Sequence, residues 1–163
     1  MSKLMQFKAD VPNKQILIER EFDADIQDVW NAYTKSELLD QWWAPYPFKN
    51  KTRSMNFAEG GMWHYCMISP DNQVHWALLK YLKISPQVSF EAKDSFCDEN
   101  ANLNTSFPSM HWSNMFIREN RQTKLSIVIT AEQSEHIEQY IQIGFKEGFE
   151  SGLNQLEQLL KNK

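Results

Sequence analysis

Residues 134–161 decide the fold of this chain, and they read SEHIEQYIQIGFKEGFESGLNQLEQLLK. The stretch contains no proline, and at the α-helical period its large apolar side chains fall on one arc. This pattern predicts one amphipathic helix about 40 Å long, with Ser134 as its N-cap. The apolar arc consists of Ile137, Ile141, Phe145, Phe149, Leu153, Leu156, Leu159 and Leu160.

Three glycines spaced four residues apart, Gly144, Gly148 and Gly152, lie within this arc or at its edge. Each glycine costs roughly 0.8–1 kcal/mol relative to alanine in a helix interior. Two explanations fit their placement. Another backbone packs closely against this face of the helix, or the face leaves room for a cavity, and both hold if the room lies beside the contact.

The remaining sequence predicts one domain of the α+β class. A strand at 14–22 is followed by two short helices, at 26–34 and 37–43. A run of further strands then precedes the terminal helix, with short connections that favour hairpins and an antiparallel sheet. These strands are predicted at 49–57, 62–69, 74–85, 88–93, 109–118 and 124–130. Residues 1–13 are interpreted as a lead-in, and residues 14–163 as the single domain.

Composition and charge narrow the classes of partner. The net charge is −4 without a basic stripe, so we expect no nucleic-acid partner. No stretch approaches 18 apolar residues, and the N-terminal residues lack the apolar core of a signal peptide, so we expect no membrane span and a cytoplasmic location. Cys66 and Cys97 are expected to be free thiols.

Several short motifs of this chain occur together in one known family. They are Val29-Trp30 followed by Ala32-Tyr33-Thr34, Glu37-Leu38-Leu39 with Trp42-Trp43-Ala44-Pro45, the Glu59-Gly60-Gly61 turn, the strand end from Tyr81 to Pro86, and Gly144-Phe145 with Gly148-Phe149. With these residues the chain resembles the activator of Hsp90 ATPase homologue 1-like proteins of bacteria, in the START-like, Bet v 1-like (SRPBCC) superfamily. It departs from the family pattern at Asp25 and Phe149, where proline and tryptophan are common.

The resemblance implies a helix-grip fold. In this fold a curved antiparallel sheet, here of about six or seven strands, wraps around a long C-terminal helix over a hydrophobic cavity. Two short helices follow the first strand. The resemblance implies no single activity, because the superfamily includes lipid carriers, aromatic cyclases, hormone receptors and co-chaperones.

The aromatic residues, 13% of the chain, are the best candidates for a binding site. Because apolar groups occur on both faces of the predicted strands, alternation does not assign the inner face, and the rings would equally fill a core. The predicted cavity residues are Trp43, Trp63, Tyr65, Trp76, Trp112, Phe145, Gly148, Phe149 and Gly152. Candidate polar contacts are His64, His75, His111 and Glu138, whose alternative roles are hydrogen-bonded or solvent-facing side chains.

Motifs for catalysis and for metal binding are absent from the sequence. The histidines and cysteines lack H-x-H and C-x-x-C spacing, and no G-x-S-x-G, P-loop or G-x-G-x-x-G motif occurs. We therefore predict no catalytic residue, metal or cofactor, and we interpret Cys66 as a small buried hydrophobic residue.

These observations favour a binding module over an enzyme. The expected function is non-enzymatic binding of a small hydrophobic molecule between the sheet and the C-terminal helix. One alternative is an Hsp90 co-chaperone-like interaction protein, and another is a cyclase- or hydrolase-type enzyme that uses the same cavity. The sequence is also compatible with a chaperone partner and with a homodimer.

Overall fold

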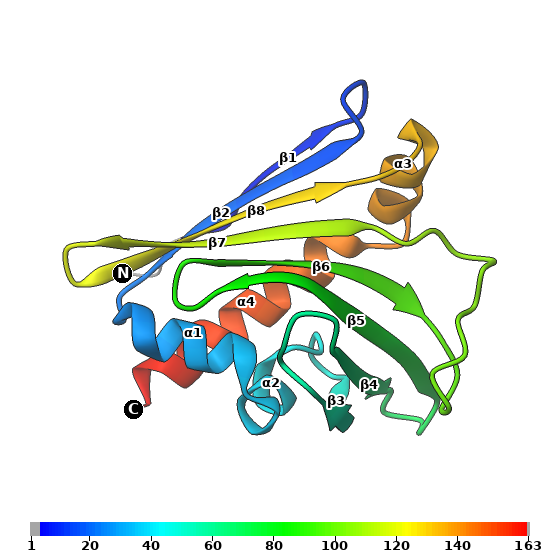
Figure 1. The fold of residues 1–163 in the computed structure, drawn as a ribbon, viewed down its shortest axis with the longest axis horizontal. Helices are drawn as coiled ribbons and strands as arrows, with labels where there is room; N and C mark the ends of the chain where they lie inside the picture. Colours follow the sequence, from blue (N-terminus) through cyan, green and yellow to red (C-terminus); the bar gives the residue numbers. More distant parts are fainter. Residues whose placement is uncertain (1–3, 163) are drawn as a thin grey trace.

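The computed structural model, which describes residues 4–162, is built around a single antiparallel sheet of eight strands. The strands lie in the order β1-β2-β8-β7-β6-β5-β4-β3 (Figure 1). In chain order the elements are β1 (Gln6–Asp10), β2 (Gln15–Phe22), α1 (Ile26–Thr34), α2 (Ser36–Trp42), β3 (Lys49–Met55), β4 (Met62–Ile68), β5 (Val74–Ser85), β6 (Ser89–Phe96), β7 (His111–Glu119), β8 (Gln122–Thr130), α3 (Ser134–Gln142) and α4 (Phe145–Lys161).

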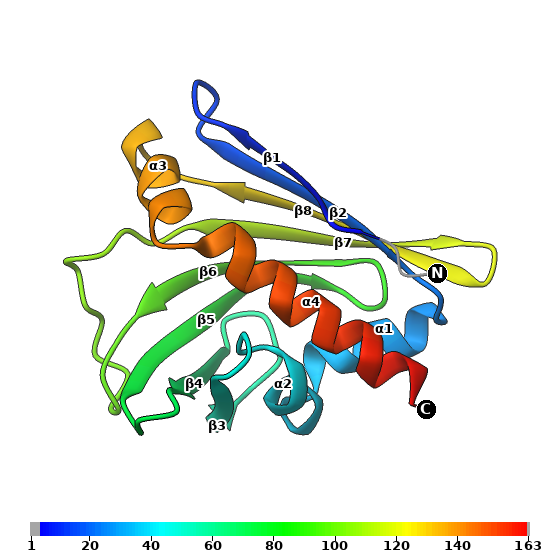
Figure 2. The ribbon, with the colours of Figure 1, turned by 180° about the vertical axis from the view of Figure 1, so that it is seen from behind.

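The helix α4 lies across one face of this curved sheet (Figure 2). Its C-terminal end reaches α1 and α2, which lie beside it at one end of the sheet (Figure 2). All strand pairs are antiparallel, and consecutive strands from β3 to β8 are neighbours. The predicted α+β helix-grip architecture is therefore confirmed, including the two short helices after the strand that holds Ile16 and Ile18.

The eighth strand comes from the segment interpreted as a lead-in. Residues 6–10 form β1, which pairs with β2 in the register Phe7↔Ile18 and Ala9↔Ile16. This strand is mostly exposed, so its sequence lacks the buried alternation that revealed the other strands. The first three residues of the predicted lead-in, and Lys163 at the end of the predicted domain, lie outside the described residues.

The prediction of one continuous terminal helix is wrong. Helix α3 ends at Gln142, and α4 begins at Phe145. Between them Gly144 adopts the left-handed backbone conformation, with φ +87°, which glycine reaches without the steric penalty of a side chain. Gln133, rather than the predicted Ser134, occupies the N-cap position of α3. The break turns α3 away from the axis of α4 (Figure 2).

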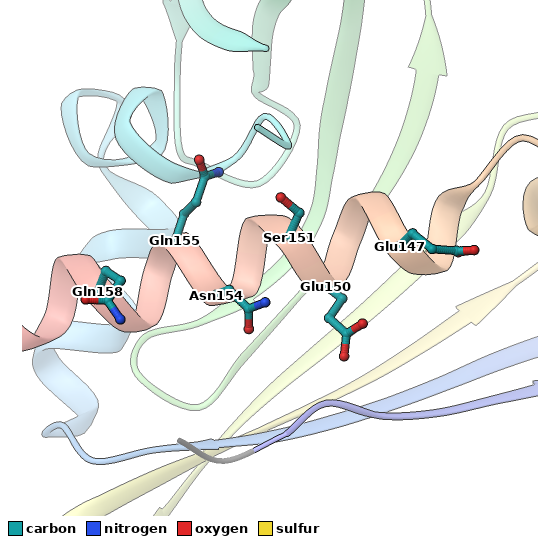
Figure 3. A pocket seen from close by; sticks show the side chains of 6 residues that line it. All are labelled: Glu147, Glu150, Ser151, Asn154, Gln155 and Gln158. Atoms are coloured by element: carbon teal, nitrogen blue, oxygen red, sulfur yellow. The ribbon is translucent and has the colours of Figure 1, made fainter. Parts of the chain in front are cut away.

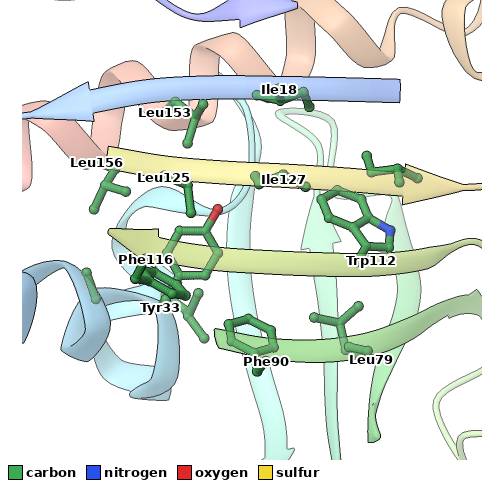
Figure 4. Close-up of a cluster of buried hydrophobic side chains, with 14 of the residues drawn as sticks. Ile18, Tyr33, Leu79, Phe90, Trp112, Phe116, Leu125, Ile127, Leu153 and Leu156 are labelled. Carbon is green, nitrogen blue, oxygen red and sulfur yellow. The ribbon is translucent and has the colours of Figure 1, made fainter. Parts of the chain in front are cut away.

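The core lies between the sheet and α4, where side chains of the inner strand faces meet α1 and α4. Figure 4 shows Ile18, Phe90, Phe116, Leu125 and Ile127 of the sheet with Tyr33, Leu153 and Leu156 of the helices. Tyr33 makes an edge contact with Phe116 at 5.3 Å between ring centroids. This packing fixes α4 against the central strands and leaves the region nearer α3 for the site described next.

Gly152 provides the close approach of two backbones that the glycine spacing suggested. A Cβ atom at this position would lie 3.3 Å from the carbonyl oxygen of Trp43 and 3.4 Å from that of Trp42. Three residues further along α4, the Gln155 side chain donates hydrogen bonds to the carbonyl oxygens of Trp42 and Ala44 at 3.0 and 2.7 Å. The end of α2 is thereby held against α4, and this contact positions Trp43.

Candidate functional site

A cavity of about 300 Å³ lies between the sheet and the junction of α3 with α4. Strands β4 to β7 form one wall, with Tyr65 and Trp112 among its residues, and Phe145 and Phe149 of α4 face them. Trp43, just after α2, closes a third side. Most of the lining is apolar or aromatic, as is usual for sites that bind small organic molecules.

The structure brings most of the predicted cavity residues together around this space. Those that line it are Trp43, Tyr65, Trp112, Phe145, Gly148 and Phe149, and of the predicted polar contacts His75 lies at its exposed rim. Trp63 lies one layer deeper. Its ring stacks on Tyr65 at 3.9 Å between centroids, and its indole N–H donates to the Thr52 hydroxyl at 2.9 Å.

The other predicted residues lie outside the cavity, because strand alternation directs them to the opposite face of the sheet or because the helix turns them away. Trp76 packs on His64, 5.0 Å between ring centroids, while its neighbour Ala77 lines the cavity. The His64 Nε2 atom lies 3.0 Å from the carbonyl oxygen of Asp98. The imidazole of His111 pairs with Glu91 at 3.0 Å. Gly152 packs against the Trp43 backbone, and Glu138 is exposed.

The sequence interpretation missed Asp94 and Tyr140, the most polar part of the wall. The predicted strand ended at Lys93, whereas β6 continues to Phe96. The period-two pattern of Phe90, Ala92 and Asp94 is the signal that extends this inner face by one residue. Tyr140 was not singled out on the predicted helix, although it lies three residues after Ile137, within the spacing of one helix face.

Asp94 is a half-buried carboxylate that accepts hydrogen bonds from three other residues. Its Oδ1 accepts the backbone N–H of Met110 at 2.7 Å, and its Oδ2 accepts the indole N–H of Trp112 at 3.0 Å. The Tyr140 hydroxyl donates to the same Oδ2 at 2.5 Å. Burial raises the pKa of Asp94, and the hydrogen bonds from these three donors and from its own backbone N–H act in the opposite direction. The bond to Tyr140 also ties α3 to the sheet at the edge of the cavity.

We expect the raised pKa of Asp94 to appear in the pH dependence of stability. A carboxyl group whose pKa is higher in the folded chain favours folding when protonated, so its contribution falls as the pH rises from about 3.8 to the folded value. The free energy of unfolding of the wild type minus that of Asp94→Asn should therefore decrease over this range, by at most about 1.4 kcal/mol per pH unit. Urea unfolding at a series of pH values measures it, and a difference that grew with pH would contradict the assignment.

A second polar group in the cavity wall is the hydroxyl of Tyr65. It accepts the indole N–H of Trp43 at 3.2 Å. Burial raises the pKa of Tyr65, so the phenol stays neutral. Among residues 4–162 no acceptor is assigned to the Tyr65 proton, which leaves this O–H free to donate to a molecule in the cavity.

A second depression lies on the outer side of α4 (Figure 3). It has a volume of about 350 Å³, is open to solvent, and is lined by polar side chains such as Glu147 and Glu150. Two of its residues already support the fold: Gln155 holds the end of α2, and Asn154 accepts a hydrogen bond from buried Arg20 at 2.9 Å. The aromatic cavity is therefore the better candidate for a binding site.

Within residues 4–162, no three His, Cys, Asp or Glu side chains lie close enough together to hold a metal ion. None of the helices in this part of the chain combines the length and apolar character needed to cross a membrane.

A curved antiparallel sheet closed over a C-terminal helix, with an aromatic cavity between them, defines a Bet v 1-like helix-grip protein. The sequence matches the profile of the family described as activator of Hsp90 ATPase homolog 1-like protein over residues 23–161. The chain belongs to this family, which confirms the resemblance drawn from its motifs. No curated protein matches the sequence.

Solved structures from several bacteria share the whole fold. The protein Ms6760 from Mycobacterium smegmatis is 26% identical with a TM-score of 0.87, and the match covers 95% of each chain. A protein from Staphylococcus epidermidis is 29% identical with a TM-score of 0.85, covering 96% of this chain and 94% of that one. A protein from Arthrobacter aurescens, at 24% identity, has a TM-score of 0.91, covering 97% and 92%.

Proposed function

We propose that this protein binds a small hydrophobic molecule in the cavity between its sheet and its C-terminal helix, without chemical conversion. The observation that carries the proposal is the aromatic cavity of about 300 Å³ at the α3–α4 junction. Flat apolar surfaces are supplied by Trp43 just after α2, Trp112 of β7 and Phe149 of α4. Few polar groups are directed into the cavity, and such groups orient a ligand rather than solvate it.

The arrangement of the histidines favours binding over catalysis. The enzyme alternative, a cyclase or hydrolase type, would use histidine or tyrosine side chains in the cavity, and the candidate histidines were His64, His75 and His111. Of these, His75 reaches its rim, while His64 and His111 lie on the opposite face with backbone and carboxylate partners. We also propose a cytoplasmic location, because Cys66 and Cys97 are free thiols, the state expected in a reducing compartment.

Gly148 offers a direct test of the cavity. A Cβ atom there would lie 3.7 Å from the Pro45 side chain, an ordinary contact, so Gly148→Leu should fold with its larger side chain in the cavity. We expect this variant to lose at least about tenfold in affinity for an apolar guest, the equivalent of about 1.4 kcal/mol. The probe is N-phenylnaphthylamine, an uncharged dye whose fluorescence rises in apolar sites.

The matched control is Glu147→Leu, which adds the same side chain at the exposed neighbouring position of α4. It should bind the dye as the wild type does. Circular dichroism and thermal unfolding establish that both variants are folded. Equal binding by folded Gly148→Leu and by the wild type would contradict the assignment of the cavity. Independently of these variants, native mass spectrometry of protein purified from its source would identify any guest that co-purifies.

A further inference from the structure

We propose that the guest of this cavity is an apolar amine, held with its protonated nitrogen at Asp94, and that apolar carboxylic acids are rejected. The inference rests on the proposed function and names the class of ligand.

The wall of the cavity contains a half-buried acid without a basic partner among the residues that line it. In the part of the chain described, the residues that line the cavity include no lysine or arginine. The partners of Asp94 are all uncharged donors, from Met110, Trp112 and Tyr140. The basic residues nearest along the strands, Lys93 of β6 and its cross-strand partner Lys80, are exposed. Nothing described in the wall therefore compensates the charge of this carboxylate.

Every hydrogen-bond donor to Asp94 is uncharged. The Met110 N–H donates to Oδ1, the Trp112 and Tyr140 side chains donate to Oδ2, and the backbone N–H of Asp94 itself also favours the ionised form. An ammonium group would supply a charged donor and with it the missing positive charge. The Tyr65 hydroxyl, whose proton is free, would instead serve an acceptor elsewhere on the guest.

An anionic guest meets the opposite situation. Its charge would enter a region of low dielectric beside the Asp94 carboxylate, where interactions between charges are several times stronger than in water. Among the described residues that line the cavity, the other titratable side chains are two tyrosines and His75. His75 lies exposed at the rim, where solvent screens its interactions. The same apolar ring should therefore bind well as an amine and poorly as an acid.

Three naphthalene derivatives test this charge preference by isothermal titration calorimetry at slightly alkaline pH. Naphthylmethylamine is cationic, naphthylmethanol neutral and naphthoic acid anionic. We expect wild-type protein to bind the amine at least about tenfold more tightly than the acid, with the alcohol between them. In Asp94→Asn the amine should weaken by about tenfold and the acid should gain, while the alcohol should change by less than about threefold.

The matched control is Glu91→Gln, which removes a carboxylate of the same strand that pairs with His111 on the opposite face. It should keep the wild-type order of the three compounds. Two results would overturn the proposal: wild-type protein that binds acid and amine equally, or a preference for the amine that survives in folded Asp94→Asn. If Asp94→Asn does not fold, the order of the three affinities measured for the wild-type protein tests the proposal.

The same titrations separate this inference from the proposed function. If the protein binds N-phenylnaphthylamine but shows no charge preference, the cavity is still supported as a binding site and the proposal of an amine guest is refuted. Protein that binds neither the dye nor any of the three naphthalene compounds refutes both.

Discussion

Trp43→Ala is expected to lower the free energy of unfolding by about 3–5 kcal/mol, the usual cost of truncating a tryptophan in a core. The Trp43 ring contacts Tyr33 and Trp42 on its core side and Trp112 and Phe149 on its cavity side. Trp43 also borders a second, much smaller space in the core, lined by Tyr33 and Phe90 among others. Its removal would merge that space with the cavity and leave α2 poorly packed against α4. Chemical denaturation of wild type and variant measures the loss.

A matched control for this variant is Trp76→Ala. Trp76 is also partly buried, but it lies on the opposite face of the sheet, where its main aromatic contact is His64. We expect it to cost less than half as much as Trp43→Ala. Similar losses for the two variants would show that Trp43 does not hold core and cavity together as described.

The second large effect is expected at Asp94. In Asp94→Ala the donors of Met110, Trp112 and Tyr140 lose their common acceptor inside the protein. Because an unsatisfied buried donor costs about 1–3 kcal/mol, the variant should lose about 3 kcal/mol or more in free energy of unfolding. Tyr140→Phe removes one of these bonds without leaving a donor unpaired, so it should cost about 1 kcal/mol. The two are compared by urea unfolding, and an alanine variant no weaker than Tyr140→Phe would contradict this reasoning.

Most of the sheet could be predicted from the sequence because its strands are half buried. In β2 and β8 buried and half-buried residues alternate along the whole strand, and this alternation is visible in the sequence itself. Strand β1 lacks such a pattern, since its pairing depends on the free edge of β2 rather than on its own side chains. A short exposed edge strand is therefore found only when its neighbour is known.

The three glycines of the terminal stretch show why the site was harder to predict than the fold. In the sequence they look alike, but Gly144 breaks the helix, Gly148 borders the cavity and Gly152 allows two backbones to approach. Which of these roles a glycine has depends on the residues that face it, and these are known only from the folded structure. The inner face of β4 was ambiguous for the same reason, because both faces of this strand carry apolar side chains.

The order of the strands in the sheet also determines when each strand can find its partner while the chain is being synthesised. One edge of β2 pairs with β1 and the other with β8, so that Gln15 lies opposite Thr130 and Phe22 opposite Thr123. On the ribosome, β8 emerges about a hundred residues after β2, which at 5–20 residues per second is a delay of roughly 5–20 s. Throughout that interval the edge of the nascent β1–β2 hairpin, including buried Ile16 and Ile18, lacks its partner. During this interval the edge is open to factors that bind nascent chains.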